Sequence, residues 1–82
     1  MMRIHVHFFS TIRARIGEKN ITIELEPGSR VADLKEQIAS RYPAAAPTIA
    51  GMNSAVNHVF ADDNALLTDE AEVAFFPYVT GG

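Results

Sequence analysis

The chain has 82 residues, of which 48% are hydrophobic, and this is enough for one domain with a single small core. Seven Lys and Arg against ten Asp and Glu give a net charge of -3, which argues against a nucleic-acid partner because such proteins present a basic face. The absence of cysteine excludes disulfides, thiolate metal sites and a cysteine nucleophile.

The hydropathy pattern argues against a membrane segment and a secretion signal. No apolar run approaches the ~18 residues that a membrane span needs. Residues 1–9 alternate between polar and apolar instead of forming the apolar block of a signal peptide. We therefore expect a soluble cytoplasmic protein without a membrane partner.

Residues 3–9 alternate cleanly and predict the first strand. One face is apolar and the other carries basic and imidazole groups, namely Ile4, Val6 and Phe8 against Arg3, His5 and His7. The two histidines raise the question of a metal, but no Asp, Glu or Cys is close in sequence to complete a ligand set. We therefore predict no metal site.

Residues 10–16 are ambiguous, and one reading is a helical turn that follows a Ser or Thr cap and ends at Gly17. Arg13 and Arg15 form a basic cluster in this segment. These charges are either ordinary solvated groups or a docking site for an acidic partner.

Residues 21–26 alternate again and predict a second strand that forms a hairpin with the first. Pro27 and Gly28 then turn the chain, and Ser29 is the expected N-cap of a helix of about three turns. The helix has an apolar stripe and a polar side, formed by Val31, Leu34, Ile38 and Tyr42 and by Asp33, Lys35, Glu36 and Arg41. The stripe is expected to cover one face of a sheet.

The second half of the chain predicts shorter elements. Residues 43–53 contain two prolines and look like a loop. Residues 54–61 predict two short strands joined by a turn at Asn57 and His58. Residues 73–76 are apolar and aromatic and predict the last strand, which should end at Pro77 because proline cannot donate a ladder hydrogen bond.

The order of strand, strand, helix, short strands and strand is typical of an α+β protein with a mixed sheet packed against one main helix. This is the β-grasp, or ubiquitin-like, architecture, in which the last strand lies beside the first in mid-sheet. We expect a β-grasp domain over residues 1–77 and a flexible, extended C-terminal Gly-Gly tail over residues 78–82.

The tail has the clearest chemical consequence. The five residues after Pro77 can reach about 17 Å if extended. Gly81 and Gly82 lack Cβ atoms, so the thread can enter a narrow tunnel of another protein and present its carboxylate there. The tail has no side chain that titrates near neutral pH, so partners must supply the acid, base and electrophile groups.

Several segments resemble the small subunit of molybdopterin synthase, the MoaD family of the MoaD/ThiS superfamily. They are residues 55–57, 67–69 and 72–77, the Gly81–Gly82 end, and residues 6–9 followed by Arg13. The resemblance covers the whole chain and is most specific in its C-terminal third. Tyr78 is a departure, because the family often has a second proline there.

The resemblance implies a non-catalytic carrier subunit rather than a stand-alone enzyme. An E1-like adenylating enzyme would use ATP to activate the Gly82 carboxylate, and a sulfur donor protein would convert it to a thiocarboxylate. The large subunit of molybdopterin synthase would then accept the tail within a heterotetramer. Sulfur would pass to a cyclic pterin phosphate and build the dithiolene of the molybdenum cofactor, with no cofactor bound by this chain.

We predict that Gly82 and Gly81 carry the chemistry and that other residues bind partners. If Val73 and Phe75 face the helix, Phe76 lies on the open sheet face and can form an apolar patch with Phe60. The alternative is that both phenylalanines are core residues. The predicted partner-binding residues are Phe60, Phe76, Pro77, Tyr78, Val79, Thr80 and Arg13.

Other functions share this fold and tail. They are a sulfur carrier for another pathway of the thiamine type, a ubiquitin-like protein modifier, and a non-catalytic β-grasp interaction module. An independent hydrolase or transferase is disfavoured, because the chain has no cysteine, its histidines are scattered, and its carboxylates lie in turns and on predicted solvent faces.

Overall fold

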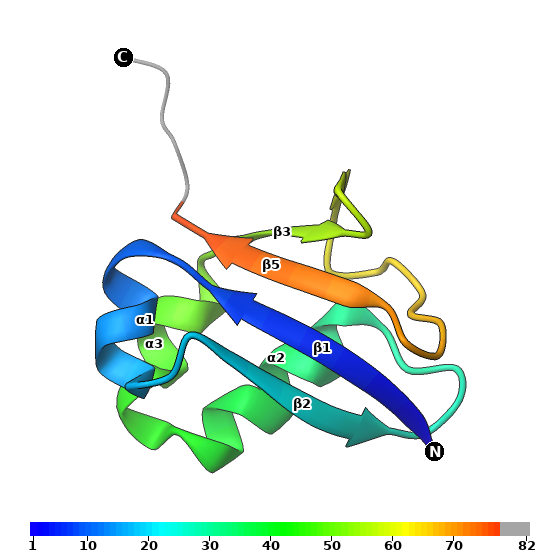
Figure 1. Ribbon diagram of the computed structural model, residues 1–82, viewed down its shortest axis with the longest axis horizontal. Helices are drawn as coiled ribbons and strands as arrows, with labels where there is room; N and C mark the ends of the chain where they lie inside the picture. The colour runs from blue at the N-terminus through cyan, green and yellow to red at the C-terminus, as the bar shows by residue number, and fades with distance from the viewer. Residues whose placement is uncertain (78–82) are drawn as a thin grey trace.

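The computed structural model describes residues 1–77, and the predicted tail, residues 78–82, lies outside them (Figure 1). The elements are β1 (Met2–Phe8), α1 (Ser10–Ile16), β2 (Asn20–Leu25), α2 (Val31–Arg41), the 3-10 helix η1 (Pro43–Ala45), α3 (Ala46–Ala50), β3 (Asn53–Val56), β4 (Val59–Ala61) and β5 (Glu72–Phe76). None of the helices among these residues is long and apolar enough to cross a membrane.

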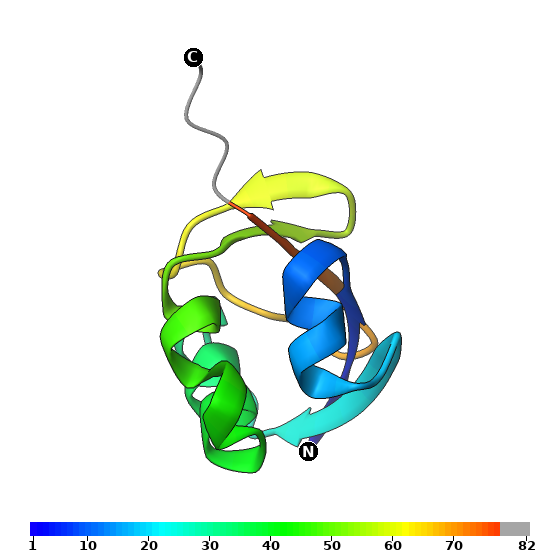
Figure 2. The ribbon, with the colours of Figure 1, turned by 90° about the vertical axis from the view of Figure 1, so that its left-hand side faces the viewer.

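The strands of residues 1–77 form one mixed sheet in the order β2-β1-β5-β3-β4. β1 pairs antiparallel with β2 and parallel with β5, so the last strand lies beside the first in the middle of the sheet. β3 continues the sheet by pairing antiparallel with both β5 and β4. α2 and α3 lie on one side of the sheet, and the other side is open (Figures 1 and 2). This topology confirms the predicted β-grasp fold.

Alternation along the strands builds the core. Every second side chain of β1 and β5 points toward the helices, and these positions are apolar. α2 meets them with apolar side chains at helical spacing. The buried set includes Ile4, Val6, Phe8, Val73 and Phe75 from the sheet and Val31, Leu34 and Ile38 from α2. The predicted inward faces of the first strand, the last strand and the helix are therefore confirmed.

The connection between β1 and β2 is a helix rather than a short turn. α1 occupies all of residues 10–16 and buries both of its isoleucines. It ends as predicted at Gly17, whose φ is 80° and whose N–H donates to the Arg13 carbonyl. The predicted Ser or Thr cap is wrong. The N-cap is Phe9, because its extended backbone (φ -128°, ψ 160°) continues the strand directly into a helix that already includes Ser10.

The main helix begins one residue later than predicted. Ser29 is not its N-cap, because the first helical residue is Val31; the Ser29 N–H donates to the Glu26 carbonyl at 3.1 Å in the preceding turn. Arg30 is the N-cap, and its backbone N–H donates to the Asp33 carboxylate at 2.8 Å. An acidic residue in the first turn also suits the helix dipole.

Residues 43–53 were predicted to be a loop, and this is wrong for most of the segment, which forms η1 and α3. Pro43 and Pro47 stand in the first turns of these two helices, where a missing N–H leaves no intrahelical bond unmade. Ala45 and Ile49 are buried in the core. Helices of three and five residues are too short to show a periodic pattern, and this is why the prolines indicated a loop.

Lys35 was expected on the solvent side of α2, and the structure buries it, with only 8% of the residue exposed. Its Nζ donates to the Met52 carbonyl at 2.8 Å and lies 2.9 Å from an Asp63 carboxylate oxygen. The ammonium group thereby links α2 to the segment after α3 and to the loop after β4. Both partners are distant in sequence, so helical periodicity alone predicted the wrong environment.

The hairpin of β3 and β4 turns at Asn57 and His58, as predicted. Both residues have positive φ angles, 50° and 71°. Positive φ at both central positions is the mark of a two-residue type I′ turn, whose twist matches that of the flanking strands. The turn holds β4 and its exposed side chains beside β3.

Candidate functional site

The predicted site is divided between the described residues and those that follow. Phe60, Phe76, Pro77 and Arg13 lie within residues 1–77. Gly81 and Gly82, and the predicted contacts Tyr78, Val79 and Thr80, lie outside the described residues. The described part of the site is therefore the end of β5 and the sheet face around it.

Phe60 and Phe76 meet on the open face of the sheet. Phe76 follows the buried Phe75 in β5, so strand alternation turns it to the opposite face. The two rings pack edge to face, with centroids 5.5 Å apart and an interplanar angle of 75°. Phe60 is 78% exposed and Phe76 is half-buried. The predicted apolar pair is confirmed, and the alternative that both are core residues is wrong.

The same face contains a hollow of about 260 Å³. Ala55 of β3 and Ala74 of β5 are partners in the strand register. Their small side chains form the floor of the hollow between larger neighbouring side chains. The larger side chains around the hollow are those of His7, Phe9, His58 and Glu72. This volume is below the range of drug-sized ligand pockets and suits a single apolar side chain of a partner.

Phe9 is an aromatic residue of this surface that the sequence-based prediction missed. It is 52% exposed, whereas its neighbour Phe8 is 1% exposed. The sequence predicts a first strand that runs through Phe9 and assigns no role to that side chain. A signal was present, because the alternation that buries Phe8 turns Phe9 outward, and exposed apolar groups that gather into a patch mark contact surfaces.

Arg13 lies at the same end of the sheet. It is an exposed residue of α1 and lines a shallow hollow together with Phe9 and Lys19. Because β1 and β5 are parallel, the end of β1 that leads into α1 is also the end of β5 that leads to Pro77 (Figure 1). The structure therefore gathers Arg13 and the aromatic residues near the end of the described chain, while the predicted role of Arg13 in binding stays a prediction.

The polar part of the open face contains two histidine–glutamate pairs. His5 Nε2 lies 2.9 Å from Glu70 Oε1, and His7 Nε2 lies 3.1 Å from Glu72 Oε1. These two glutamates are far from the histidines in sequence, and folding brings them close because β5 and the loop before it pack beside β1. Within residues 1–77, however, no three His, Asp or Glu side chains converge so that they could hold a metal ion.

The pKa of Glu70 is lowered by its neighbours on this part of the face. The hydrogen bond with His5, aided by the positive charge of Arg3, holds the pKa of the Glu70 carboxyl below its ordinary value of 4.5. The Arg3 Nε atom lies 3.3 Å from Glu70 Oε2. The carboxyl is therefore ionised throughout the neutral pH range. Its two oxygens contact the side chains of His5 and Arg3 of β1.

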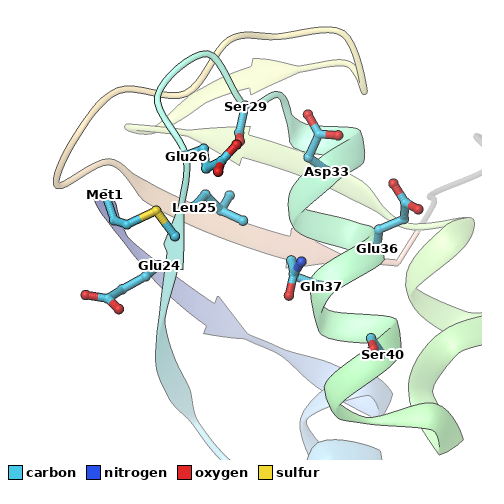
Figure 3. Close-up of a pocket in the computed structure, with 9 residues that line it drawn as sticks. All are labelled: Met1, Glu24, Leu25, Glu26, Ser29, Asp33, Glu36, Gln37 and Ser40. Atoms are coloured by element: carbon cyan, nitrogen blue, oxygen red, sulfur yellow. The ribbon is translucent and has the colours of Figure 1, made fainter.

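A larger hollow, of about 490 Å³, lies between β2 and α2 (Figure 3). Four of its lining residues are acidic, namely Glu24, Glu26, Asp33 and Glu36. Ser29 and Ser40 contribute hydroxyl groups, but no histidine lines this hollow to activate them as nucleophiles. The charged groups that line this hollow are therefore all acidic, and none of its residues belongs to β5.

The chain is similar to known proteins over nearly its whole length. Residues 6–82 match the model of the ThiS family. The chain is 31% identical over 83 residues to the molybdopterin synthase sulfur carrier subunit of Mycobacterium tuberculosis, with all of both chains covered.

Solved structures share the fold of this chain. A Pyrococcus furiosus structure, described as subunit 1 of a molybdopterin converting factor, has a TM-score of 0.86 and 30% identity, covering 96% of this chain and 100% of that one. A Helicobacter pylori complex of subunits 1 and 2 of molybdopterin-converting factor has a TM-score of 0.70 and 24% identity. The match covers 99% of this chain and 100% of that one, and at this identity it shows the fold alone.

Proposed function

Because the chain belongs to the ThiS family, we propose that it is the sulfur carrier subunit of a molybdopterin synthase. The observation that carries this proposal is the similarity to the Mycobacterium tuberculosis subunit over the full length of both chains. The family match also runs through the last residue of this chain. The proposed reactive group is accordingly the terminal carboxylate of Gly82, preceded by Gly81.

The proposed chemistry begins with activation, because a carboxylate is a poor electrophile. A Gly82 carboxylate oxygen attacks the α-phosphate of ATP on an E1-like adenylating enzyme, and pyrophosphate leaves. Sulfur delivered by a donor protein at the oxidation level of sulfide then displaces AMP, which departs with one of the carboxylate oxygens, and a thiocarboxylate remains. Residues 78–82 have no side chain that titrates near neutral pH, so acid and base groups come from the partners.

The large subunit of the synthase is the proposed partner of the open sheet face. Phe9, Phe60 and Phe76 expose apolar area at the end of the sheet that leads to Pro77. Docking on this area brings the beginning of the tail to the partner's surface. The contacts also offset the entropy that is lost when the tail is ordered in a tunnel of the partner. A heterotetramer of large and small subunits and dithiolene synthesis on a cyclic pterin phosphate belong to this proposal.

Intact mass spectrometry of the protein purified from cells that contain the pathway tests the proposal. We expect a species in which sulfur replaces one oxygen, and fragmentation should locate the sulfur at Gly82. An unmodified carboxylate in the presence of an active adenylating enzyme and a sulfur source would contradict the proposal. Recovery of the chain attached to lysines of other proteins would instead support a protein modifier.

One residue appended after Gly82 separates a carrier from an interaction module. The extension removes the reactive Gly82 carboxylate, so sulfur loading and molybdopterin synthesis should be lost while the folded domain is unchanged. One residue added before Met1 is the matched control and should leave both intact. If the C-terminal extension keeps full synthase activity, the terminal carboxylate is not the reactive group.

A further inference from the structure

All three histidines of the chain lie on or beside the open face of the sheet. His5 and His7 occupy outward positions of β1, and His58 lies in the turn between β3 and β4. Histidine is the side chain whose ordinary titration falls between pH 5 and 8, and the chain has no cysteine. Any positive charge that histidine protonation adds to the chain is therefore placed on or beside this face.

His7 occupies the boundary between the polar and apolar parts of this face. It lines the apolar hollow and also a polar hollow on the other side. Charged or titratable groups face it from β5 and the loop before it, α1, the segment before β2, the β3–β4 turn and β1 itself. They are Glu72 and Glu70, Arg13, Lys19, His58 and His5. Of these groups, Glu72 is the carboxylate that borders the apolar hollow and pairs with His7 at 3.1 Å.

A partner that fills the apolar hollow has to cover the Glu72 carboxylate, whose side chain is 55% exposed in the free chain. Taking a carboxylate out of water is costly unless a positive charge pairs with it. His7 provides that charge only in its protonated state. Docking therefore favours the protonated imidazole and, where His7 is neutral beforehand, takes up a proton from solution.

We propose that the His7–Glu72 pair couples docking of the synthase large subunit on the open face to the uptake of a proton, so that the complex tightens as the pH falls from about 8 to about 6. The identity of the partner rests on the proposed function. We place the partner on this hollow because β5 connects the hollow to the rest of the predicted site. Ala74 lines the hollow, Phe76 belongs to the aromatic pair, and Pro77 ends the described chain.

Calorimetric titration of the cognate large subunit with this chain, between pH 6 and pH 8, tests the coupling. We expect the Kd to fall roughly five- to tenfold from pH 8 to pH 6. At pH 7, the measured enthalpy should differ between two buffers of different ionisation enthalpy, with the sign of proton uptake. A Kd that changes by less than about twofold, without a buffer effect, would overturn the coupling and leave the proposed function standing. Failure to bind at every pH would overturn both.

Two variants give the coupling a distinctive signature. His7→Gln keeps a hydrogen-bond donor for Glu72 but cannot become charged, so it should bind at every pH as weakly as the natural chain at pH 8. Glu72→Gln removes the charge that needs a partner, so it should bind at every pH about as tightly as the natural chain at pH 6. If Glu72→Gln keeps the full pH dependence, protonated His7 is attracting an acidic group of the partner instead, and the proposal is wrong.

His5→Gln is the matched control for these variants. His5 pairs with Glu70 on the same strand face but does not line the apolar hollow. This variant should therefore retain the pH dependence of the natural chain. If His5→Gln loses the pH dependence while His7→Gln keeps it, the coupling belongs to the His5–Glu70 pair, and the proposal is wrong. Thermal unfolding of each variant at pH 6 and pH 8 shows that differences in binding do not come from differences in folding.

Discussion

Phe75 and Phe76 are neighbours in β5 with identical side chains, and the sheet places them in opposite environments. Phe75 is fully buried in the core, whereas Phe76 packs against the exposed Phe60 on the open face. Phe8 and Phe9 repeat the contrast at the end of β1, with 1% and 52% exposed. The covered face holds the domain together, and the open face is free to present apolar groups to partners.

Truncation on the covered face has the largest expected effect on stability. Phe75→Ala leaves a cavity in the core and should lower the free energy of unfolding by about 3–5 kcal/mol. This is a large part of the roughly 5–15 kcal/mol that stabilises a typical domain. Urea or guanidinium denaturation measures the change, and Phe75→Leu should cost less. A loss below about 1 kcal/mol would show that Phe75 is not a core residue.

Substitution on the open face should change binding rather than folding. Phe76→Glu adds a charge at a half-exposed position, so the free energy of unfolding should change by about 1 kcal/mol or less. Affinity for the synthase large subunit should fall by about tenfold or more, because buried aromatic residues dominate interfaces. Circular dichroism and calorimetric titration separate the two effects.

Leu66→Glu is the matched control for Phe76→Glu, because Leu66 is 58% exposed and does not belong to the aromatic pair of Phe60 and Phe76. It introduces the same charge at another exposed apolar position and should leave affinity close to that of the natural chain. Unfolding of Phe76→Glu would show that its side chain supports the core after all, and equal losses of affinity in both variants would point to a general charge effect.

Lys35 sharpens the contrast, because it is a charged residue in the covered layer. Lys35→Met keeps most of the side-chain volume but leaves the Met52 carbonyl without its donor, and it should destabilise the fold by about 1–3 kcal/mol. Asp63→Asn is the matched control, since the Asp63 side chain is 56% exposed and its charge should contribute at most about 1 kcal/mol. Equal stability of Lys35→Met and the natural chain would mean that the buried hydrogen bond contributes nothing net.

The smallest expected effect belongs to Glu70, an exposed group of the open face. The pKa of its carboxyl is lowered in the folded chain, chiefly by the hydrogen bond with His5. The ionised carboxyl therefore stabilises the fold above its ordinary value of 4.5, and this contribution is lost as the pH falls through the lower folded-state value. Glu70→Gln should be slightly less stable than the natural chain at neutral pH and equally stable in acid. Thermal unfolding across that range measures this, and a difference that grows in acid would contradict it.

Local pattern was enough to predict much of this molecule. Alternation in residues 3–9 and 73–76 identified the inner face of the sheet, because successive strand side chains point to opposite sides. Gly17 marked the end of α1 because its positive φ suits glycine. The position of Phe76 opposite Phe75 followed from the same alternation, and with it the apolar pair on the open face.

The same kind of pattern failed where elements are short or where partners are far apart. α3 has only five residues, and its prolines resembled those of a loop. Lys35 was assigned to solvent because its acceptor, the Met52 carbonyl, is 17 residues away.

The amino-acid sequence by itself determined the sheet-and-helix architecture, the two faces of the central strands, and the Gly81–Gly82 end on which the proposed chemistry depends. Only the tertiary structure decided which side chains meet on the open face. The His7–Glu72 pair joins residues 65 positions apart, and the hollow beside it needs β3, β5 and the end of β1 together. Such contacts depend on the register between strands, which is set when the whole core packs, and no local period in the sequence encodes it.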